Sequence, residues 1–273
     1  MPERPARLLL ALAAAAVFAF PIWFMVSSAF KAEPEVHAIP IHFWPHDFQG
    51  FGQFRQAAEI APLWRYFLNS WFYSTFHVGV TVFFGALAGF GFAKYRFPGR
   101  TLLFLGVLST IMVPFQVLVV PLFVEVKWFG WENTYGGLII PGMMNAFGVF
   151  MMRQYATDLP DELLEAARVD GAGEFHIFLR IALPLLAPAL ASLAIIIFIW
   201  SWGNFLWPLV IVQDKDLNVL SVGMTSYSQP YQREPMWAAA MAASTVATLP
   251  IAALFVFFQR YFVKGLTAAA VKG

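Results

Sequence analysis

The polar residues with the most regular spacing lie in residues 156–183, between two long apolar runs. The first half of this segment reads Asp161-Glu-Leu-Leu-Glu165-Ala166-Ala167-Arg-Val-Asp170-Gly171. Acidic side chains in the first turn and a glycine stop predict a short helix from Asp161 to Val169. The two alanines are small, so a neighbouring protein surface can approach that helix closely. Such a helix is suited to docking onto another protein.

The side chains on this predicted helix suit a docking surface. Leu163, Leu164 and Val169 supply apolar anchors, while Glu165 and Arg168 supply polar contacts. The alternative is an amphipathic loop helix that is merely solvated. The residues by themselves leave both interpretations open.

Several other chemistries lack the residues that they need. The chain has no cysteine, which excludes disulfides, thiolate nucleophiles and iron–sulfur clusters. It also has no G-x-x-x-x-G-K-[ST] loop, so a partner must hydrolyse any ATP that drives it. His37, His42, His46 and Asp47 share one segment, but their spacing fits no strong metal site, and we expect no metal.

The elements that must position the docking segment are membrane helices. Of 273 residues, 60% are hydrophobic and only 12% are charged, against roughly 25% charged in an ordinary soluble domain. Mean hydropathy is +0.67. A spanning helix needs about 20 apolar residues, and the chain offers six such segments, approximately 8–30, 68–93, 101–124, 136–155, 184–212 and 237–262. We therefore expect an all-α, polytopic membrane protein that forms a single domain over residues 1–273.

The positive charges predict the orientation. With the amino terminus in the cytoplasm, eleven of the 17 Lys and Arg residues face inside, and both termini are cytoplasmic. The formal net charge of +1 leaves no broad cationic surface for nucleic acid. The spans hold almost no ionisable groups, which argues against a proton relay. His77 lies in the second span without a carboxylate, so we interpret it as a packed neutral histidine.

The docking segment resembles a known family. With nine residues between Gly171 and Ile181-Ala-Leu183-Pro184, it matches the E-A-A-three-G-nine-I-x-L-P pattern of permease subunits of binding-protein-dependent ABC importers. Weaker matches elsewhere point to the carbohydrate-uptake, MalG-like branch. They are Phe67-Leu-Asn69-Ser70, Ala93-Lys94-Tyr-Arg96-Phe97-Pro98-Gly99, Phe198-Ile-Trp200-Ser-Trp202-Gly-Asn204-Phe-Leu-Trp207-Pro208 and the final residues from Lys264.

The resemblance implies a type I ABC importer permease, in which residues 156–183 carry the coupling helix that docks on an ATPase. The residues that inherit coupling are Glu165, Ala166, Ala167, Asp170 and Gly171, and Ile181, Leu183 and Pro184 inherit the turn into the fifth span. The implied partners are a second, MalF-like permease, a dimer of ATP-binding subunits and an extracytoplasmic solute-binding protein. ATP and Mg²⁺ stay on the ATPase, so this chain is not an enzyme and has no cofactor of its own. The implied location is the bacterial or archaeal inner membrane.

Cargo contacts are expected in the spans. Trp200, Asn204 and Trp207 fall on one face of a continuous fifth helix, where aromatic rings can stack on a sugar and an amide can bond its hydroxyls. The alternative is that Asn204 bonds a neighbouring helix and the tryptophans only pack. Weaker candidates are Gln116, Asn145 and Ser244. Gly203, where we expect a larger or polar residue in relatives, either widens the pocket or loosens the helix.

Gly85 and Gly89 form a small-xxx-small pair in the second span, which predicts close helix packing. The function expected from all these residues is import of a sugar or sugar-like solute. Two alternatives remain at this point, an ion-coupled secondary carrier and a membrane-embedded transferase.

Overall fold

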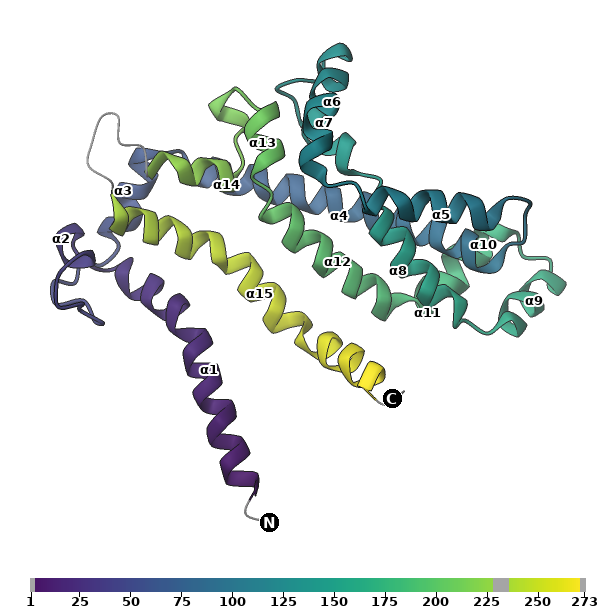
Figure 1. Cartoon of the computed structure of the whole chain (residues 1–273), viewed down its shortest axis with the longest axis horizontal. Coiled ribbons are helices and arrows are strands. Elements are labelled where there is room, and N and C mark those ends of the chain that lie inside the picture. Colours follow the sequence, from purple (N-terminus) through teal and green to yellow (C-terminus); the bar gives the residue numbers. More distant parts are fainter. Residues whose placement is uncertain (1–2, 228–235, 271–273) are drawn as a thin grey trace. The chain divides into compact units, whose positions relative to one another are not determined.

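The computed structural model describes residues 3–227 and 236–270, and the surroundings of the side chains within 7–227 and 236–258. These residues form helices and connecting segments, with no strand among them (Figure 1). In chain order the elements are α1 (Glu3–Ser28), α2 (Glu33–Val36), α3 (Gly52–Ile60), α4 (Leu63–Lys94), α5 (Arg100–Ile111), α6 (Phe115–Trp128), α7 (Tyr135–Ile139), η1 (Ile140–Gly142), α8 (Ala146–Thr157), α9 (Asp161–Val169), α10 (Glu174–Ile177), η2 (Phe178–Ala182), α11 (Leu183–Leu185), α12 (Ala187–Trp202), α13 (Leu206–Ile211), η3 (Lys215–Leu217), α14 (Leu220–Gly223), η4 (Met224–Tyr227) and α15 (Trp237–Ala270).

Packing divides the chain into two compact units. The first unit comprises Met1–Leu68 and Val219–Ala252, and the second comprises Asn69–Asn218 and Ala253–Gly273. The second unit carries α9 and most of the predicted site residues. The two ends of the chain, for which a cytoplasmic location is predicted, include residues 1–2 and 271–273, which lie outside the described residues.

Long apolar helices account for the predicted spans. On length and composition, α1, α4 and α15 can each cross a membrane, and three bent helix pairs raise the possible spans to six. The third predicted span is not straight, because α5 and α6 meet at 99° around Pro114. Proline lacks an amide proton and disfavours helical geometry in the residue before it, so the helix breaks there.

The fourth and fifth spans also depart from the predicted straight helices. The pair that contains α7 and α8 is bent by 46°, and the segment Glu174–Leu185 meets α12 at 79°. The predicted fifth span of 184–212 is not one helix, because α12 ends at Trp202 and α13 begins only at Leu206. Gly203 follows the last residue of α12, and glycine is a poor helix former. The prediction of a continuous fifth helix is therefore wrong.

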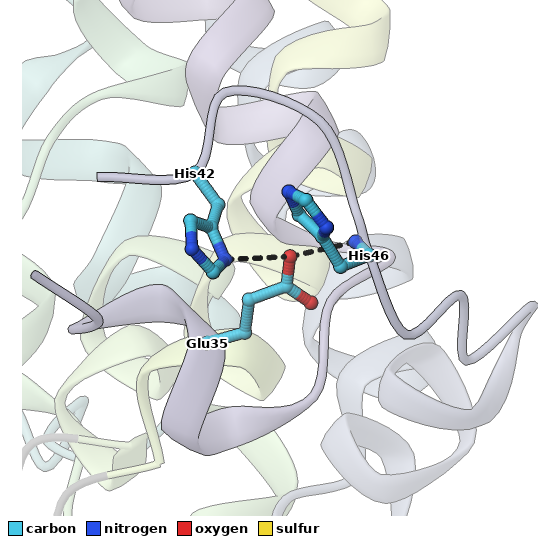
Figure 2. Close-up of side chains that lie close together, drawn as sticks. All are labelled: Glu35, His42 and His46. Carbon is cyan, nitrogen blue, oxygen red and sulfur yellow. Dashed lines mark hydrogen bonds and ion pairs between the residues drawn. The ribbon is translucent and has the colours of Figure 1, made fainter. Parts of the chain in front are cut away.

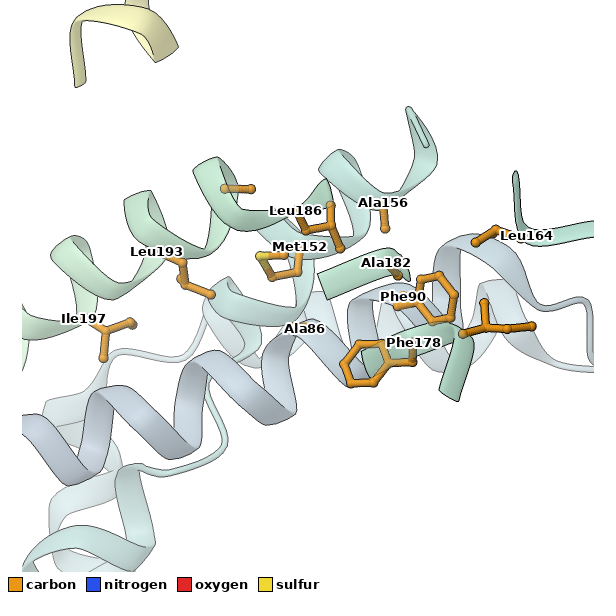
Figure 3. Packing of buried hydrophobic residues seen from close by; sticks show 12 residues of the cluster. Ala86, Phe90, Met152, Ala156, Leu164, Phe178, Ala182, Leu186, Leu193 and Ile197 are labelled. Carbon is orange, nitrogen blue, oxygen red and sulfur yellow. The ribbon is translucent and has the colours of Figure 1, made fainter. Parts of the chain in front are cut away.

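The core of the second unit forms where α4, α8 and α12 pack together. Figure 3 shows buried side chains from these helices, among them Phe90, Met152 and Leu193, which belong to one cluster with Phe178. Two glycines of α4 let α8 approach closely: a Cβ built on Gly89 would lie 2.6 Å from the Arg153 backbone nitrogen, and one on Gly85 would lie 3.2 Å from the Gly148 carbonyl carbon. The close packing predicted for these glycines is confirmed.

In the first unit, a carboxylate caps the last helix. Glu33 accepts hydrogen bonds from the backbone amides of Trp237 (2.6 Å) and Ala238 (2.9 Å), the first two residues of α15. A carboxylate at this position accepts hydrogen bonds from amides that have no partner within the helix, and its negative charge interacts favourably with the positive end of the helix dipole. Burial raises the pKa of the Tyr227 phenol to about 12, and its hydroxyl donates to the Ala57 carbonyl at 2.9 Å. These bonds tie segments distant in sequence into one unit.

The glycine contact between α4 and α8 generates a testable prediction. Gly89→Val places side-chain atoms against the Arg153 backbone, and such overpacking costs roughly 1–3 kcal/mol. We expect a clearly lower thermal unfolding midpoint of the detergent-purified chain, followed by tryptophan fluorescence. Gly91→Val is the matched control, because a Cβ at Gly91 on the same helix meets nothing within 4 Å. Equal midpoints for the two variants would contradict the contact.

Candidate functional site

The predicted docking helix is present as α9, with the predicted bounds Asp161–Val169. Pro160 precedes it in an extended conformation, and Asp161 and Glu162 occupy its first turn. The chain leaves the helix through Gly171, whose φ of +83° lies in the left-handed region that glycine adopts without strain. Local signals at both ends therefore set this helix, as the sequence predicts.

One face of α9 is buried and the other is exposed. Leu164 is only 2% exposed and belongs to the buried cluster that contains Phe178 (Figure 3). Glu165 and Ala166 are exposed, and Val169 is 88% exposed. The prediction of Leu164 as a docking anchor is wrong, because this side chain holds α9 onto its own core. The exposed side chains remain available for another protein.

The last residue of α4 holds the start of α9. The Lys94 ammonium donates to the carbonyl oxygens of Leu159 (2.5 Å) and Thr157 (3.4 Å) and to Asp161 Oδ1 (2.7 Å). The hydrogen bond from Lys94 to Asp161, together with the positive charge of Lys94, lowers the pKa of the Asp161 carboxyl. The Lys94 side chain is 6% exposed, so its bonds to the carbonyls at the end of α8 are largely shielded from water.

The next residue, Tyr95, holds the far end of α9. Its hydroxyl donates to Glu174 Oε2, and Glu174 also accepts from Arg168 Nε (2.8 Å) and Nη2 (3.2 Å). The hydrogen bonds from Arg168 and Tyr95 lower the pKa of the Glu174 carboxyl. We call Lys94, Tyr95, Asp161, Arg168 and Glu174 the clamp.

The sequence analysis missed the clamp. Arg168 was predicted as a contact to a partner, whereas it bonds Glu174 within its own chain. In the sequence, Lys94 and Tyr95 stand out only as part of a segment that resembles the permease family, and this resemblance assigns them no contact with α9. The one available signal was that charged residues follow the end of a long apolar run, and this does not reveal which loop they meet.

The end of the docking segment, with Pro184 directly after it, lies at the turn into α12. Ile181 and Leu183 are half-buried against the hydrophobic cluster, and Pro184 is exposed. Phe178–Ala182 forms a π-helical turn, which is followed by the bend of 79°. Their predicted part in turning the chain toward the membrane stays a prediction, and their positions agree with it.

The three residues expected on one helical stripe fall in different environments. Trp200 on α12 is 51% exposed and packs against Phe147 at 5.2 Å between ring centroids. Asn204 lies in the gap between α12 and α13, half-buried, and its amide donates to the Tyr73 hydroxyl at 3.1 Å. Trp207 is 2% exposed, and its indole NH donates to the carbonyls of α7 residues Gly137 (3.1 Å) and Leu138 (3.2 Å). Trp207 is thus a buried packing residue.

The weaker cargo candidates lie on three different segments of the chain. Gln116 is exposed in the first turn of α6. Asn145 caps α8 by accepting from the Phe147 amide at 2.9 Å, and it lines an apolar cavity of about 420 Å³ between α4, α5 and α8. Ser244 is half-buried on the part of α15 that belongs to the first unit. Gln116 and Asn145 thus lie in the second unit and Ser244 in the first.

Two polar residues of α4 have structural partners. His77 Nε2 lies 2.7 Å from the Gly142 carbonyl, and no carboxylate contacts this ring within the described part of the chain, which supports its interpretation as a packed histidine. Asn69 donates to the carbonyls of Asp216 (2.8 Å) and Asn218 (2.9 Å) and accepts from the Tyr135 hydroxyl at 2.7 Å. Asn69 thus joins three segments of the second unit.

Comparison with known proteins identifies the class to which this fold and loop belong. Residues 81–268 match the family described as binding-protein-dependent transport system inner membrane component. The match covers more than half of the chain, and the chain belongs to this family. It is a permease subunit of an ABC importer, which works with a second permease, an ATPase and a binding protein, and it is not an enzyme.

Individual relatives extend over nearly the whole chain. The arabinooligosaccharides transport system permease protein AraQ of Halalkalibacterium halodurans is 38% identical over 256 residues, which cover 93% of this chain and 91% of the relative. AraQ of Bacillus subtilis is 40% identical over 209 residues, 77% of this chain and 74% of the relative. The sn-glycerol-3-phosphate transport system permease protein UgpE of Escherichia coli is 33% identical over 259 residues, which cover 92% of this chain and 91% of the relative.

A solved structure shares the fold. It is a crystal structure of a bacterial ABC transporter involved in the import of the acidic polysaccharide alginate, and one chain of it superposes with a TM-score of 0.84 at 22% identity. The alignment covers 94% of this chain and 95% of that chain. The all-helical permease fold expected from the sequence is confirmed.

The clamp leads to a prediction about the order of α9. Glu174→Ala removes both hydrogen bonds of Arg168, and a partly exposed ion pair of this kind is worth about 0.5–1 kcal/mol. We expect backbone amides of α9 to exchange hydrogen roughly two- to fivefold faster in the purified chain. Glu162→Ala, which removes an exposed carboxylate from the same helix, should change the exchange much less. The same rates in both variants would show that the clamp does not hold α9.

Proposed function

We propose that this chain is the MalG-like permease of an ATP-driven importer for a sugar or sugar-like solute, and that residues 1–273 act as one domain forming half of the pathway through the lipid bilayer. Relatives named for arabino-oligosaccharides and for sn-glycerol-3-phosphate support a polyhydroxylated cargo. The companion permease is MalF-like in this proposal. The solute reaches the pair from an extracytoplasmic binding protein.

The observation that carries the docking proposal is the exposed face of α9. Ala166 adds no bulk to this face, Glu165 offers a charge, and Val169 offers an apolar contact that its own chain leaves exposed. Leu164 and the clamp hold the opposite side. A helix that is fixed on one side and open on the other is suited to receive a partner, and we assign this face to the ATPase.

Orientation follows from that assignment. ATP and Mg²⁺ belong to the ATPase in the cytoplasm, so in this proposal α9 is cytoplasmic. An even number of predicted spans precedes α9 in the chain and an even number follows it, so we expect both termini to be cytoplasmic as well. The excess of Lys and Arg on this side agrees with the positive-inside rule. The location is the inner membrane of a bacterium or archaeon.

The contacts of α9 suggest how closure of the ATPase reaches the membrane. The clamp connects both ends of α9 to Lys94 and Tyr95 at the end of α4. After Glu174 the chain continues through η2 and α11 into α12. Movement of α9 is thereby passed to two spans together. ATP binding then shifts the population between inward-open and outward-open states because it favours one of them.

Two substitutions test the docking proposal. Glu165→Lys reverses a charge on the exposed face, and Gly171→Thr puts a β-branched residue at φ +83°, which costs roughly 1–2 kcal/mol. We expect each to lower uptake and cargo-stimulated ATP hydrolysis of the reconstituted transporter about tenfold, since a 1.4 kcal/mol loss at the interface corresponds to that factor. Insertion of the permease should persist.

Matched controls separate docking from general damage. Glu165→Gln keeps the shape of the side chain without reversing its charge, and Gly173→Thr acts at an ordinary φ of −71° two residues away. Both should retain most of the uptake. If Glu165→Lys and Gly171→Thr assemble and transport at the native rate, α9 is not the docking surface.

For cargo, we propose that Asn204 and Trp200 line the path, with Gln116, Asn145 and Ser244 as further contacts and Trp207 as a support behind them. The gap between α12 and α13 supports this choice for Asn204, because backbone groups freed by a helix break tend to face a cavity or another protein segment. Trp200 offers half of its surface as a stacking platform.

The bond between Asn204 and Tyr73 makes the cargo proposal testable. Asn204→Leu leaves a cargo hydroxyl unpaired, at about 1–3 kcal/mol, so we expect uptake per assembled transporter to fall roughly tenfold or more. Tyr73→Phe removes the same bond between helices but keeps the ring, which stacks on His77. It should change uptake less than about twofold if cargo contact is what matters. Equal losses in both variants would give Asn204 a structural role only.

A further inference from the structure

A polar cluster outside the transport machinery lies between α1 and α3. Glu35 on α2 faces His42 and His46 on the following loop, as Figure 2 shows. The sequence groups His37 and Asp47 with these histidines, and their spacing predicts no metal. The structure replaces both: the ring of His37 packs against Trp237 at 5.6 Å, and Asp47 contributes its backbone amide. Glu35, not anticipated from the sequence, completes the set.

Contacts around the cluster fix the loop before any ligand binds. Ser27 donates to the Phe43 carbonyl at 2.7 Å, and Lys31 donates to the His42 carbonyl at 2.6 Å. Glu35 accepts from the backbone amides of His46 (2.7 Å) and Asp47 (3.3 Å). The backbone carrying both histidines is therefore held against α1 and α2, and the cluster does not depend on a chance loop conformation.

The distances suit one metal ion. His42 Nδ1 lies 3.4 Å from Glu35 Oε1, and one ligand atom from each of the three residues lies within 4.8 Å of the other two. Two ligands on a tetrahedral Zn²⁺ with bonds of about 2.1 Å lie about 3.4 Å apart, whereas a strong N–H···O hydrogen bond is about 2.9 Å. His42 Nδ1 and Glu35 Oε1 already have the spacing of two ligands on one metal ion. The His46 side chain is exposed, so it can move the short distance that brings its ring nitrogen to the same ion.

The chemical state of the groups agrees with that spacing. His42 Nδ1 is buried, and its contact with Glu35 Oε1 at 3.4 Å is longer than a strong hydrogen bond. Two backbone amides donate to the Glu35 carboxylate and favour its ionised form, which is the form that ligates a metal. The Lys31 ammonium donates to the His42 carbonyl and lies 4.6 Å from the centroid of the Phe24 ring.

We propose that Glu35, His42 and His46 form a binding site for a divalent transition metal of the Zn²⁺ class. Two imidazoles and a carboxylate are a ligand set that Zn²⁺ accepts, with a fourth position left to water. The metal fastens the loop of residues 38–47 to α2. This site is independent of the proposed docking and cargo residues.

Direct metal binding tests the site. We suggest purifying the assembled transporter without a histidine tag, stripping it with a chelator and titrating Zn²⁺ against a chromophoric competitor. The native chain should bind about one Zn²⁺ that His46→Ala or His42→Ala weakens about tenfold or more. Cu²⁺ bound at the same site should show nitrogen couplings in its electron paramagnetic resonance spectrum that each variant reduces.

His37→Ala is the matched control, because it removes a histidine of the same segment that lies outside the cluster. It should bind Zn²⁺ as the native chain does, and comparison within the same assembly cancels any metal held by the partner subunits. Native Zn²⁺ binding that His42→Ala and His46→Ala leave unchanged, or no stoichiometric binding at all, would overturn the proposal. Equal weakening by His37→Ala would do the same.

Discussion

The second unit depends on the backbone approach of α4 and α8 at Gly85 and Gly89. Lipid provides little hydrophobic force between helices, so close contact of small residues has to hold them together. Because the two helices run in contact, the end of α4 arrives beside the end of α8, where Lys94 reaches the carbonyls of Thr157 and Leu159. Without that approach the lysine has no acceptors and α9 loses its support.

Supporting α9 is a balance between burial and exposure. The helix is nine residues long and too short to be stable by itself in water. Leu164 supplies its one fully buried apolar contact, and charged groups of the clamp hold its two ends. Charged contacts at the ends leave the middle of the outer face unobstructed. Burying more apolar side chains of α9 against its own chain would stabilise the helix more, but it would also cover the surface that we assign to the ATPase.

Local features of this protein could be predicted from its sequence, and contacts between distant segments could not. The bounds of α9 follow from acidic residues and Gly171 within a few positions of its ends, and apolar length alone indicates the spans. The predicted stripe of cargo residues failed because it assumed a helix that continues past Gly203. The meeting of Glu35 with His42 depends on how an irregular loop folds back, and no periodic pattern records that. Arg168 illustrates the same limit, since its partner lies beyond a turn.

The interrupted helix at Gly203 has a mechanical consequence. On one side, α12 is a helix of sixteen residues that follows the docking segment and α11. On the other side, α13 is held to α7 by the hydrogen bonds that the Trp207 indole donates to two backbone carbonyls of α7. Because the helix is interrupted between Trp202 and Leu206, we expect the joint between α12 and α13 to act as a hinge when α12 tilts. Asn204, bonded to Tyr73, lies at this joint, where the backbone has to absorb any change in the angle between the two helices.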